Sequence, residues 1–235
     1  WIGAFITVSI TLYATKVYRS GEKKSLNKLS SIFEVLMEFI RKDIVVPNIG
    51  KSHSQSWTPL IATFFIFILV GNFVGMIPFF ERIPFVSGSS TITGNFAITA
   101  ALACITFFSI IIAGTLKHGF LGHWKNMIPN DVPAPVLIIL IPIEIMGMFI
   151  KPLALTLRLG ANMTAGHIGL VAIFGIPMII FQSYESVLIG FSVGIVSVIL
   201  NIAIYFLEIL VCLVQAYVFS LLSAVFIGMA IHPQH

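Results

Sequence analysis

Two very long apolar runs constrain the fold of this chain more than any other feature of its sequence. They cover about residues 133–174 and 186–231 and carry very little charge. A membrane helix needs about 20 apolar residues to cross roughly 30 Å of hydrocarbon. Because a helix of about 40 residues is about 60 Å long, each run must either be broken into two spans or lie strongly tilted in the membrane.

Three shorter runs, at about residues 1–18, 57–80 and 92–116, have the length of single membrane crossings. The composition agrees, because 58% of the 235 residues are hydrophobic and only 9% are charged, which leaves no room for a soluble domain of ordinary size. We therefore predict an all-α integral membrane protein that forms a single domain over residues 1–235, with about five membrane helices.

Residues 25–46, between the first two runs, have a different pattern, SLNKLSSIFEVLMEFIRKDIVV. Apolar side chains recur there at helical spacing and alternate with charged ones. The pattern predicts an amphipathic helix that lies on the membrane surface. A helix that docks on a soluble partner is the alternative.

The basic residues predict the orientation of the chain in the membrane. Most of them lie between residues 16 and 51, with Lys117 and Lys125 in the third loop, whereas the second loop has only Arg82 beside Glu81. Because loops rich in lysine and arginine stay on the inner side of the membrane, we expect the N-terminus outside and the C-terminus inside.

Arg158 is the one charged residue between Lys151 and Glu185, in the middle of the first long run. An arginine at the centre of a membrane helix costs about 2.5–3.5 kcal/mol on an insertion scale. We therefore expect Arg158 to face a water-filled cavity or a carboxylate of a partner. A structural salt bridge, or a side chain that reaches towards the membrane surface, is the alternative.

Helical spacing sorts the polar neighbours of Arg158. At about 100° per residue, Asn162 and Glu144 each lie about 40° from Arg158, so the three share a face. His167, nine residues further on, points about 180° away. This helix is therefore expected to present an arginine and an amide to one neighbour and an imidazole to another.

The last run carries a second polar stripe. Asn201, Glu208 and Gln215 are spaced by sevens, which corresponds to a rotation of only about 20° per step. Glu208 and His167 are groups that exchange protons near neutral pH when water reaches them. We interpret them as a proton-handling pair on facing helices, with a purely structural hydrogen bond as the alternative.

Other kinds of chemistry find no support in the sequence. It contains no HExxH motif, no CxxC pair and no glycine-rich phosphate loop in a strand–helix context, and it lacks a module of basic and aromatic residues for nucleic acid. We expect no metal, no cofactor and no nucleic-acid partner.

Five blocks occur in the order of a known family. They are GNFVGMIP, LKHG, PIEIMGMFIKP, PLALTLRLGANMTAGH and LEILVCLVQAYVFSLLSAVFIG. From about residue 57 onward the chain resembles subunit a of the F-type ATP synthase. The resemblance implies a proton-translocating stator subunit, not catalytic by itself, that works against the ring of c subunits. It also implies the peripheral stalk subunit b and other membrane subunits of the synthase as partners.

The resemblance assigns a role in proton translocation to six residues. Arg158 would be the essential arginine, with Asn162 and Gln215 as polar neighbours facing the rotor, while Glu144, His167 and Glu208 would line two aqueous half-channels. Asn72 and Asn201 would be secondary polar residues of the channel lining. The two long runs would form a strongly tilted hairpin around the ring, in a bacterial plasma membrane or, as the alternative, a mitochondrial inner membrane.

Two positions depart from the family pattern. Gly75 stands where some relatives have an acid, so the entry channel would depend on other groups. Gly160 replaces a bulkier residue, which changes the expected packing against the ring. Two other classes of function remain open on the residues: a secondary transporter in which Arg158 binds an anionic substrate, and an intramembrane enzyme, for which a nucleophile with a base at matched spacing is missing.

Overall fold

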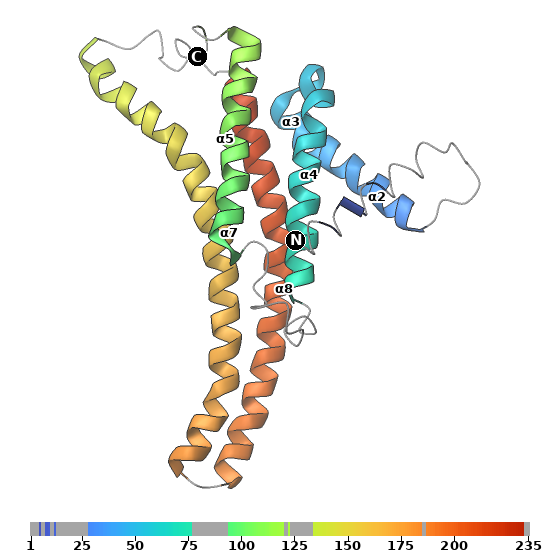
Figure 1. The fold of residues 1–235 in the computed structure, drawn as a ribbon, viewed down its shortest axis with the longest axis vertical. Helices are drawn as coiled ribbons and strands as arrows, with labels where there is room; N and C mark the ends of the chain where they lie inside the picture. The colour runs from blue at the N-terminus through green and yellow to red at the C-terminus, as the bar shows by residue number, and fades with distance from the viewer. Residues whose placement is uncertain are drawn as a thin grey trace.

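The computed structural model describes single residues 5, 8, 9 and 12, and the ranges 28–76, 94–119, 122, 134–184 and 187–232. The regular elements in these ranges are all helical, which confirms the predicted all-α class. Figure 1 shows them in chain order: α2 (Lys28–Phe39), a π-helical turn η1 (Ile40–Val45), α3 (Val46–Ile49), α4 (Lys51–Met76), α5 (Phe96–His118), α7 (Ala134–Tyr184) and α8 (Val187–Ile231).

Within the described ranges, four helices are long and apolar enough to cross a membrane: α4, α5, α7 and α8. They correspond to the predicted runs at 57–80, 92–116, 133–174 and 186–231. The predicted first span, 1–18, lies outside the described residues except at four positions, so a fifth membrane helix stays a prediction. The protein is an integral membrane protein.

The two long runs are single continuous helices, and α7 extends beyond residue 174, where the predicted run ends. α7 has 51 residues and continues through Pro142, Pro152 and Pro177 to Tyr184. A proline removes one backbone hydrogen bond, but neighbouring helices and small local adjustments allow membrane helices to tolerate it. At about 1.5 Å per residue α7 is about 75 Å long and α8 about 68 Å, roughly twice the thickness of a membrane core.

α7 and α8 form a long antiparallel hairpin (Figure 1). Near its turn, the side chain of Phe181 packs against Gly190. α4 and α5 lie beside the half of the hairpin that holds the C-terminal part of α8, whereas the other half projects beyond them (Figure 1). Among the described residues, the projecting half is therefore in contact mainly with itself.

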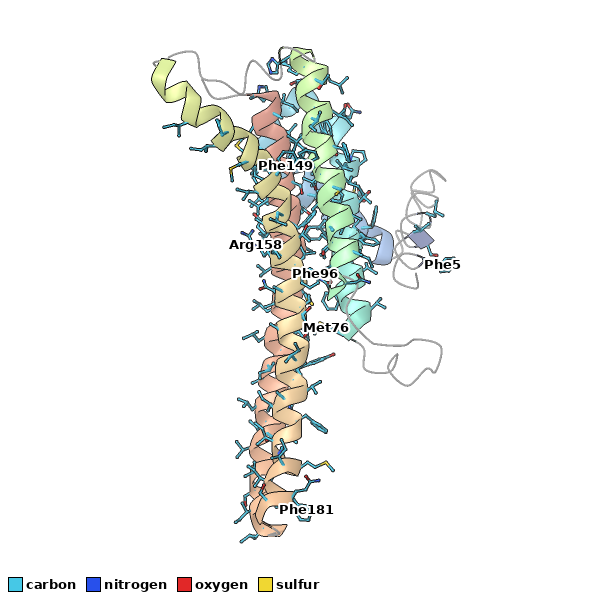
Figure 2. The ribbon with its side chains drawn as sticks, turned by 60° about the vertical axis from the view of Figure 1, so that its left-hand side comes forward. Phe5, Met76, Phe96, Phe149, Arg158 and Phe181 are labelled. Atoms are coloured by element: carbon cyan, nitrogen blue, oxygen red, sulfur yellow. The ribbon has the colours of Figure 1, made fainter. Side chains whose placement is uncertain are left out.

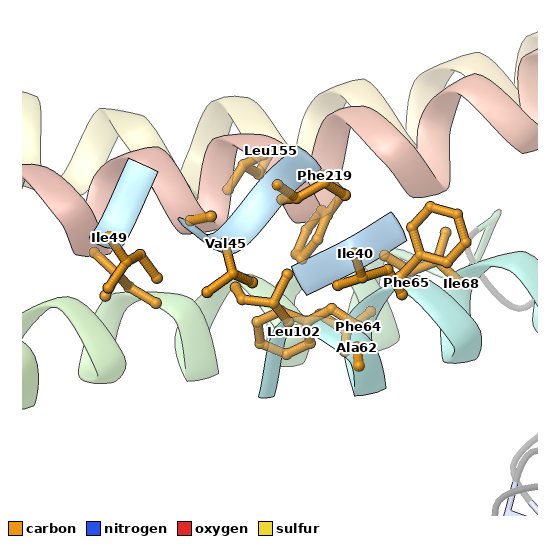
Figure 3. Packing of buried hydrophobic residues seen from close by; sticks show 14 of the residues in the cluster. Ile40, Val45, Ile49, Ala62, Phe64, Phe65, Ile68, Leu102, Leu155 and Phe219 are labelled. Carbon is orange, nitrogen blue, oxygen red and sulfur yellow. The ribbon is translucent and has the colours of Figure 1, made fainter. Parts of the chain in front are cut away.

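The hydrophobic core lies where α4, α5 and α8 meet the η1 turn, as Figure 3 shows. Phe64 of α4 and Phe219 of α8 meet edge to face with ring centroids 5.5 Å apart. Both side chains are almost completely buried. At the end of this core, the backbone of α3 touches Gly228 of α8, where a Cβ atom would overlap the carbonyl oxygen of Asn48.

The predicted amphipathic helix at 25–46 differs from expectation in its second half. The α-helical part ends at Phe39, and the chain continues through η1 and α3 into α4. Ile40 and Ile44 are fully buried in the core, while Ile32 and Val35 of α2 remain 65% and 64% exposed. Apolar residues near the entry to α4 are thus used by the bundle itself, and a role at the membrane surface concerns α2 alone.

Candidate functional site

Arg158 lies on the exposed face of α7, and Asn162, one helical turn later, is exposed beside it. The opposite side of this part of α7 is packed into the bundle, because Leu155, Leu159 and Met163 are at most 1% exposed. Figure 2 shows Arg158 on the side of α7 away from Phe96 of α5. The structure therefore brings the predicted arginine and amide together on one outward face.

The surroundings of Arg158 on this face are small or apolar. Ala154, Ala161 and Ala165 are exposed at neighbouring positions on the helix. Within the described ranges, the ion pair joins Glu38 to Lys42, and none involves Arg158. The small side chains leave the arginine accessible to a partner that packs against α7.

Lys151, two turns before Arg158, has a contact of its own within the chain. Its ammonium nitrogen lies 5.6 Å from the centre of the Phe226 ring of α8, the distance of a cation–π contact. Its charge thus helps to hold α7 against α8.

The polar stripe of α8 lies on the opposite, inward side of the hairpin. Glu208 and Gln215 are 3% and 4% exposed, and both amide atoms of Asn201 are buried without a hydrogen-bond partner among the described residues. The structure differs here from the expectation that Gln215 shares the exposed face of Asn162. The heptad spacing keeps Gln215 in line with Glu208, and this line packs inward.

The carboxyl group of Glu208 lies directly against the backbone of α7. A Cβ atom placed on Gly166 would be 2.9 Å from Oε1 of Glu208, closer than real side chains approach. The missing side chain of Gly166 thus makes the space that the carboxyl group occupies. His167 is the next residue along α7, so the predicted pair lies on facing turns of the two helices. The side chains of His167 and Glu144 lie outside the described residues.

A seam between α4 and α8 continues from Glu208. The Sγ atom of Cys212 is 3.2 Å from Sδ of Met76, and the hydroxyl of Tyr205 donates a hydrogen bond of 3.1 Å to the backbone carbonyl of Met76. Asn72, one turn before Met76 on α4, is fully buried. Residues four apart share a helix face, so Asn72 and Glu208 belong to the same interior seam.

The sulfur contacts of this seam and the role of Gly166 were not predicted from the sequence. Methionine and cysteine in an apolar run carry no pattern that distinguishes a lipid-facing position from a buried one. Tyr205 could have indicated a buried position on this side of α8, because a hydroxyl group on an apolar membrane helix needs a hydrogen-bond partner.

Gly160 also differs from expectation. It is buried and packs against the Phe96 ring of α5, so in the described chain it faces the bundle and not an external ring. The other departure, Gly75, lies at the end of α4, nearly one turn beyond Asn72, and is partly buried.

The cavities near the site are apolar or lie at its end. A groove of about 360 Å³ between α4 and α8 is lined by apolar side chains and Tyr205, and a cavity of about 200 Å³ lies where α3 meets the end of α8. Neither is lined by Arg158. No group of three or more metal-binding side chains occurs within the described part of the chain.

The arrangement thus combines an accessible cation on one face of α7 with a buried carboxyl group between α7 and α8. The family model described as ATP synthase A chain matches residues 1–228. The chain belongs to this family. The four long apolar helices of the described part of the chain are consistent with this membership.

Curated relatives agree with this membership. The chain is 39% identical to ATP synthase subunit a of Chloroherpeton thalassium over all of its own length and 66% of that protein. It is 39% identical to ATP synthase subunit a of Myxococcus xanthus over 88% of its length and 62% of that protein. For ATP synthase subunit a of Bradyrhizobium diazoefficiens the identity is 33%, over 98% of this chain and 87% of that protein. The chain spans slightly less than two thirds of the length of the first of these relatives.

Proposed function

We propose that the chain is the proton-translocating stator subunit of an F-type ATP synthase, coupling proton flow through the membrane to rotation of a ring of c subunits. One observation carries the proposal. Arg158 is an exposed cation in the middle of a long apolar helix, on a face that it shares with Asn162 and small side chains. Membership of the ATP synthase A chain family supports it.

The cost of this cation favours a charged partner outside the chain. An arginine that faces lipid at the centre of a membrane helix costs about 2.5–3.5 kcal/mol, and no carboxylate pairs with Arg158 within the described ranges. A carboxyl group carried past α7 by a rotor ring offsets that cost. The small side chains around Arg158 allow such a ring to approach closely.

The buried seam supports a water path to the rotor. Glu208, Gln215 and Asn72 are a carboxyl and two amide side chains buried inside a largely apolar bundle, and an ionisable side chain inside a membrane marks an ion pathway as the first hypothesis. In the proposal, Glu208, His167 and Glu144 line two half-channels that open to opposite sides. Asn72 and Asn201 add polar lining. Asn162 lies beside Arg158 on its exposed face, and Gln215 continues the buried line of Glu208 on α8.

The chemistry then follows from the cost of charge in lipid. A rotor carboxyl group must be neutral where it faces hydrocarbon. Beside the guanidinium of Arg158 the carboxylate is the favoured form, so the group releases its proton into one half-channel before it passes and takes up a proton from the other afterwards. The positive charge of Arg158 also repels a hydronium ion that would pass directly between the half-channels.

The membrane potential supplies the free energy for rotation. It gives about 2.3 kcal/mol per charge for each 100 mV, so several protons must pass for each ATP, which a ring of many carboxyl groups allows. The subunit itself makes no covalent bond. In this proposal it works with the c ring, stalk subunit b and the other membrane subunits, in a bacterial plasma membrane with the N-terminus outside and the C-terminus inside.

The test compares the two cations of α7 in vesicles that carry the assembled complex. We expect Arg158→Ala to reduce ATP-driven proton pumping to background, because the passing carboxyl group loses its counter-charge. Lys151→Ala is the matched control, because Lys151 packs on Phe226 within the chain, and it should keep coupled pumping. Coupled pumping retained by Arg158→Ala would refute the proposal.

A further inference from the structure

Phe96 of α5 packs against Gly160 in the part of α7 that carries Arg158. A Cβ atom on Gly160 would lie 2.7 Å from Cε1 and 2.9 Å from Cδ1 of the Phe96 ring. The ring therefore rests directly on the backbone of α7. Phe96 is 48% exposed, so only one side of its ring is covered. The ring atoms Cε1 and Cδ1 are the ones that contact Gly160.

This contact lies on the side of α7 opposite the candidate site. Gly160 is two residues from Arg158 and two from Asn162, and at about 100° per residue it points about 160° away from each of them. A ring that presses on Gly160 thus determines the direction in which Arg158 and Asn162 face.

A second aromatic contact fixes the same pair of helices further along. Phe107 of α5 and Phe149 of α7 are stacked, with ring centroids 5.4 Å apart and an angle of 29° between the rings. Arg158 lies between Phe149 and Gly160 on α7. Two contacts on one side of a helix restrict its rotation about its own axis, which a single contact does not.

The first turn of α5 is itself held in place. Asn95 precedes the helix, and its side-chain oxygen accepts a hydrogen bond of 3.0 Å from the backbone N–H of Ala97. Such a cap fixes the direction in which the helix begins. Phe96 is the first residue after the cap, so its ring has a defined position from which to press on Gly160.

We propose that Phe96 is a positioning residue for proton translocation, which sets the rotation of α7 through Gly160 and so holds Arg158 and Asn162 towards the rotor. The inference rests on the proposed role of Arg158. It goes beyond that role because it assigns the orientation of the arginine to a ring on a different helix.

The experiment measures protons pumped per ATP hydrolysed, divided by the amount of assembled complex, in membrane vesicles. This ratio changes if the arginine is misdirected, whereas a variant that only assembles poorly lowers the amount of complex. Gly160→Ala should lower the ratio about fivefold, because the added methyl group overlaps the Phe96 ring and displaces it from its seat on α7. Gly147→Ala is the matched control, since a Cβ atom on that glycine of α7 meets nothing within 4 Å.

Variants of the ring itself complete the test. Phe96→Ala should lower the ratio of protons pumped per ATP. Phe96→Leu should keep a ratio close to that of the parent, because leucine still covers Gly160. The double variant Phe96→Ala with Gly160→Ala should have a higher ratio than Gly160→Ala alone. If Gly160→Ala fails to assemble, Phe96→Ala is compared with Phe96→Leu. A lower ratio for Phe96→Ala supports the positioning role, and equal ratios contradict it.

Three outcomes overturn the inference: Gly160→Ala equal to its control, Phe96→Ala equal to the parent, or no rescue in the double variant. Arg158→Ala in the same assay separates the two proposals. If it remains coupled, the proposed function fails. If it is uncoupled while the Phe96 and Gly160 variants behave like the parent, the positioning role alone fails.

Discussion

α7 and α8 are the two longest helices of the protein and are similarly apolar, yet they use their polar residues in opposite ways. α7 turns Arg158 and Asn162 outward. α8 buries Glu208 and Gln215. The difference shows that one helix of the hairpin turns a charge to its outer face, while the other contributes polar groups to the interior of its own bundle.

The largest effect is expected when the contact that holds α8 against α3 is disrupted, because this contact keeps the polar line of α8 inside the bundle. A Cβ atom on Gly228 would overlap the backbone carbonyl oxygen of Asn48, and neither backbone can move freely. We expect Gly228→Ala to destabilise the protein by about 2 kcal/mol, within the range for overpacked sites, and to lower the yield of assembled complex.

Thermal dissociation of the purified complex measures this loss. Gly194→Ala on the same helix is the control, because a Cβ atom there meets nothing within 4 Å. Equal midpoints for Gly228→Ala and Gly194→Ala would show that α8 does not depend on this contact.

The second variant tests whether the buried carboxyl group of α8 exchanges protons. Glu208→Gln keeps the shape of the side chain and removes its acid function. We therefore expect proton flux through the membrane sector to fall about a hundredfold, the lower end of the range for loss of an acid–base group, with a changed dependence on pH. Assembly should stay normal. Flux measured from pH 6 to 9 in vesicles without the soluble sector gives the answer, and an unchanged profile would leave Glu208 with a structural role only.

A smaller effect is expected when the carboxyl group is kept but displaced. Gly166→Ala places a methyl group 2.9 Å from Oε1 of Glu208, so the carboxyl group must shift while its acid function remains. Flux should decrease less than in Glu208→Gln. Gly169→Ala, one turn along α7 with open space for a Cβ atom, should match the parent, and a loss as large in this control would argue against a local effect on Glu208.

The smallest effect is expected outside the hairpin, at the exposed Glu38–Lys42 pair. The hydrogen bond and charge of Lys42 lower the pKa of Glu38. Its contribution to stability is therefore present above the ordinary carboxyl pKa and is lost as the pH falls through the lowered value. Because the pair is fully exposed and screened by solvent, Glu38→Gln should leave thermal stability at neutral pH unchanged. A clear loss of assembled complex would indicate a partner at α2.

Much of the fold could be predicted because the length of an apolar run indicates a membrane helix. The starts of α7 and α8 differ by one residue from the predicted runs. The end of α7 could not be predicted, since Pro177 is a strong break signal in water and a weak one inside a packed membrane bundle. The second half of the amphipathic segment was misjudged because periodicity indicates an apolar face without saying what covers it.

The candidate site was predictable where helical spacing alone decides the geometry. Spacing places Arg158 with Asn162, and Glu208 with Gln215, on common faces. It does not say which face turns inward, and for this reason the burial of Gln215 was missed. The contacts of Gly160 and Gly166 depend on which residue of another helix arrives opposite them, information that no local pattern contains.

The absence of proline from α8 has a mechanical consequence. Helices bend sharply at prolines, and α7 contains Pro142, Pro152 and Pro177, whereas the 45 residues of α8 contain none. A sideways force applied at the projecting end of the hairpin therefore meets no proline along α8 before the core around Phe219. In the proposed stator, α8 would carry the recoil of each rotor step to that core.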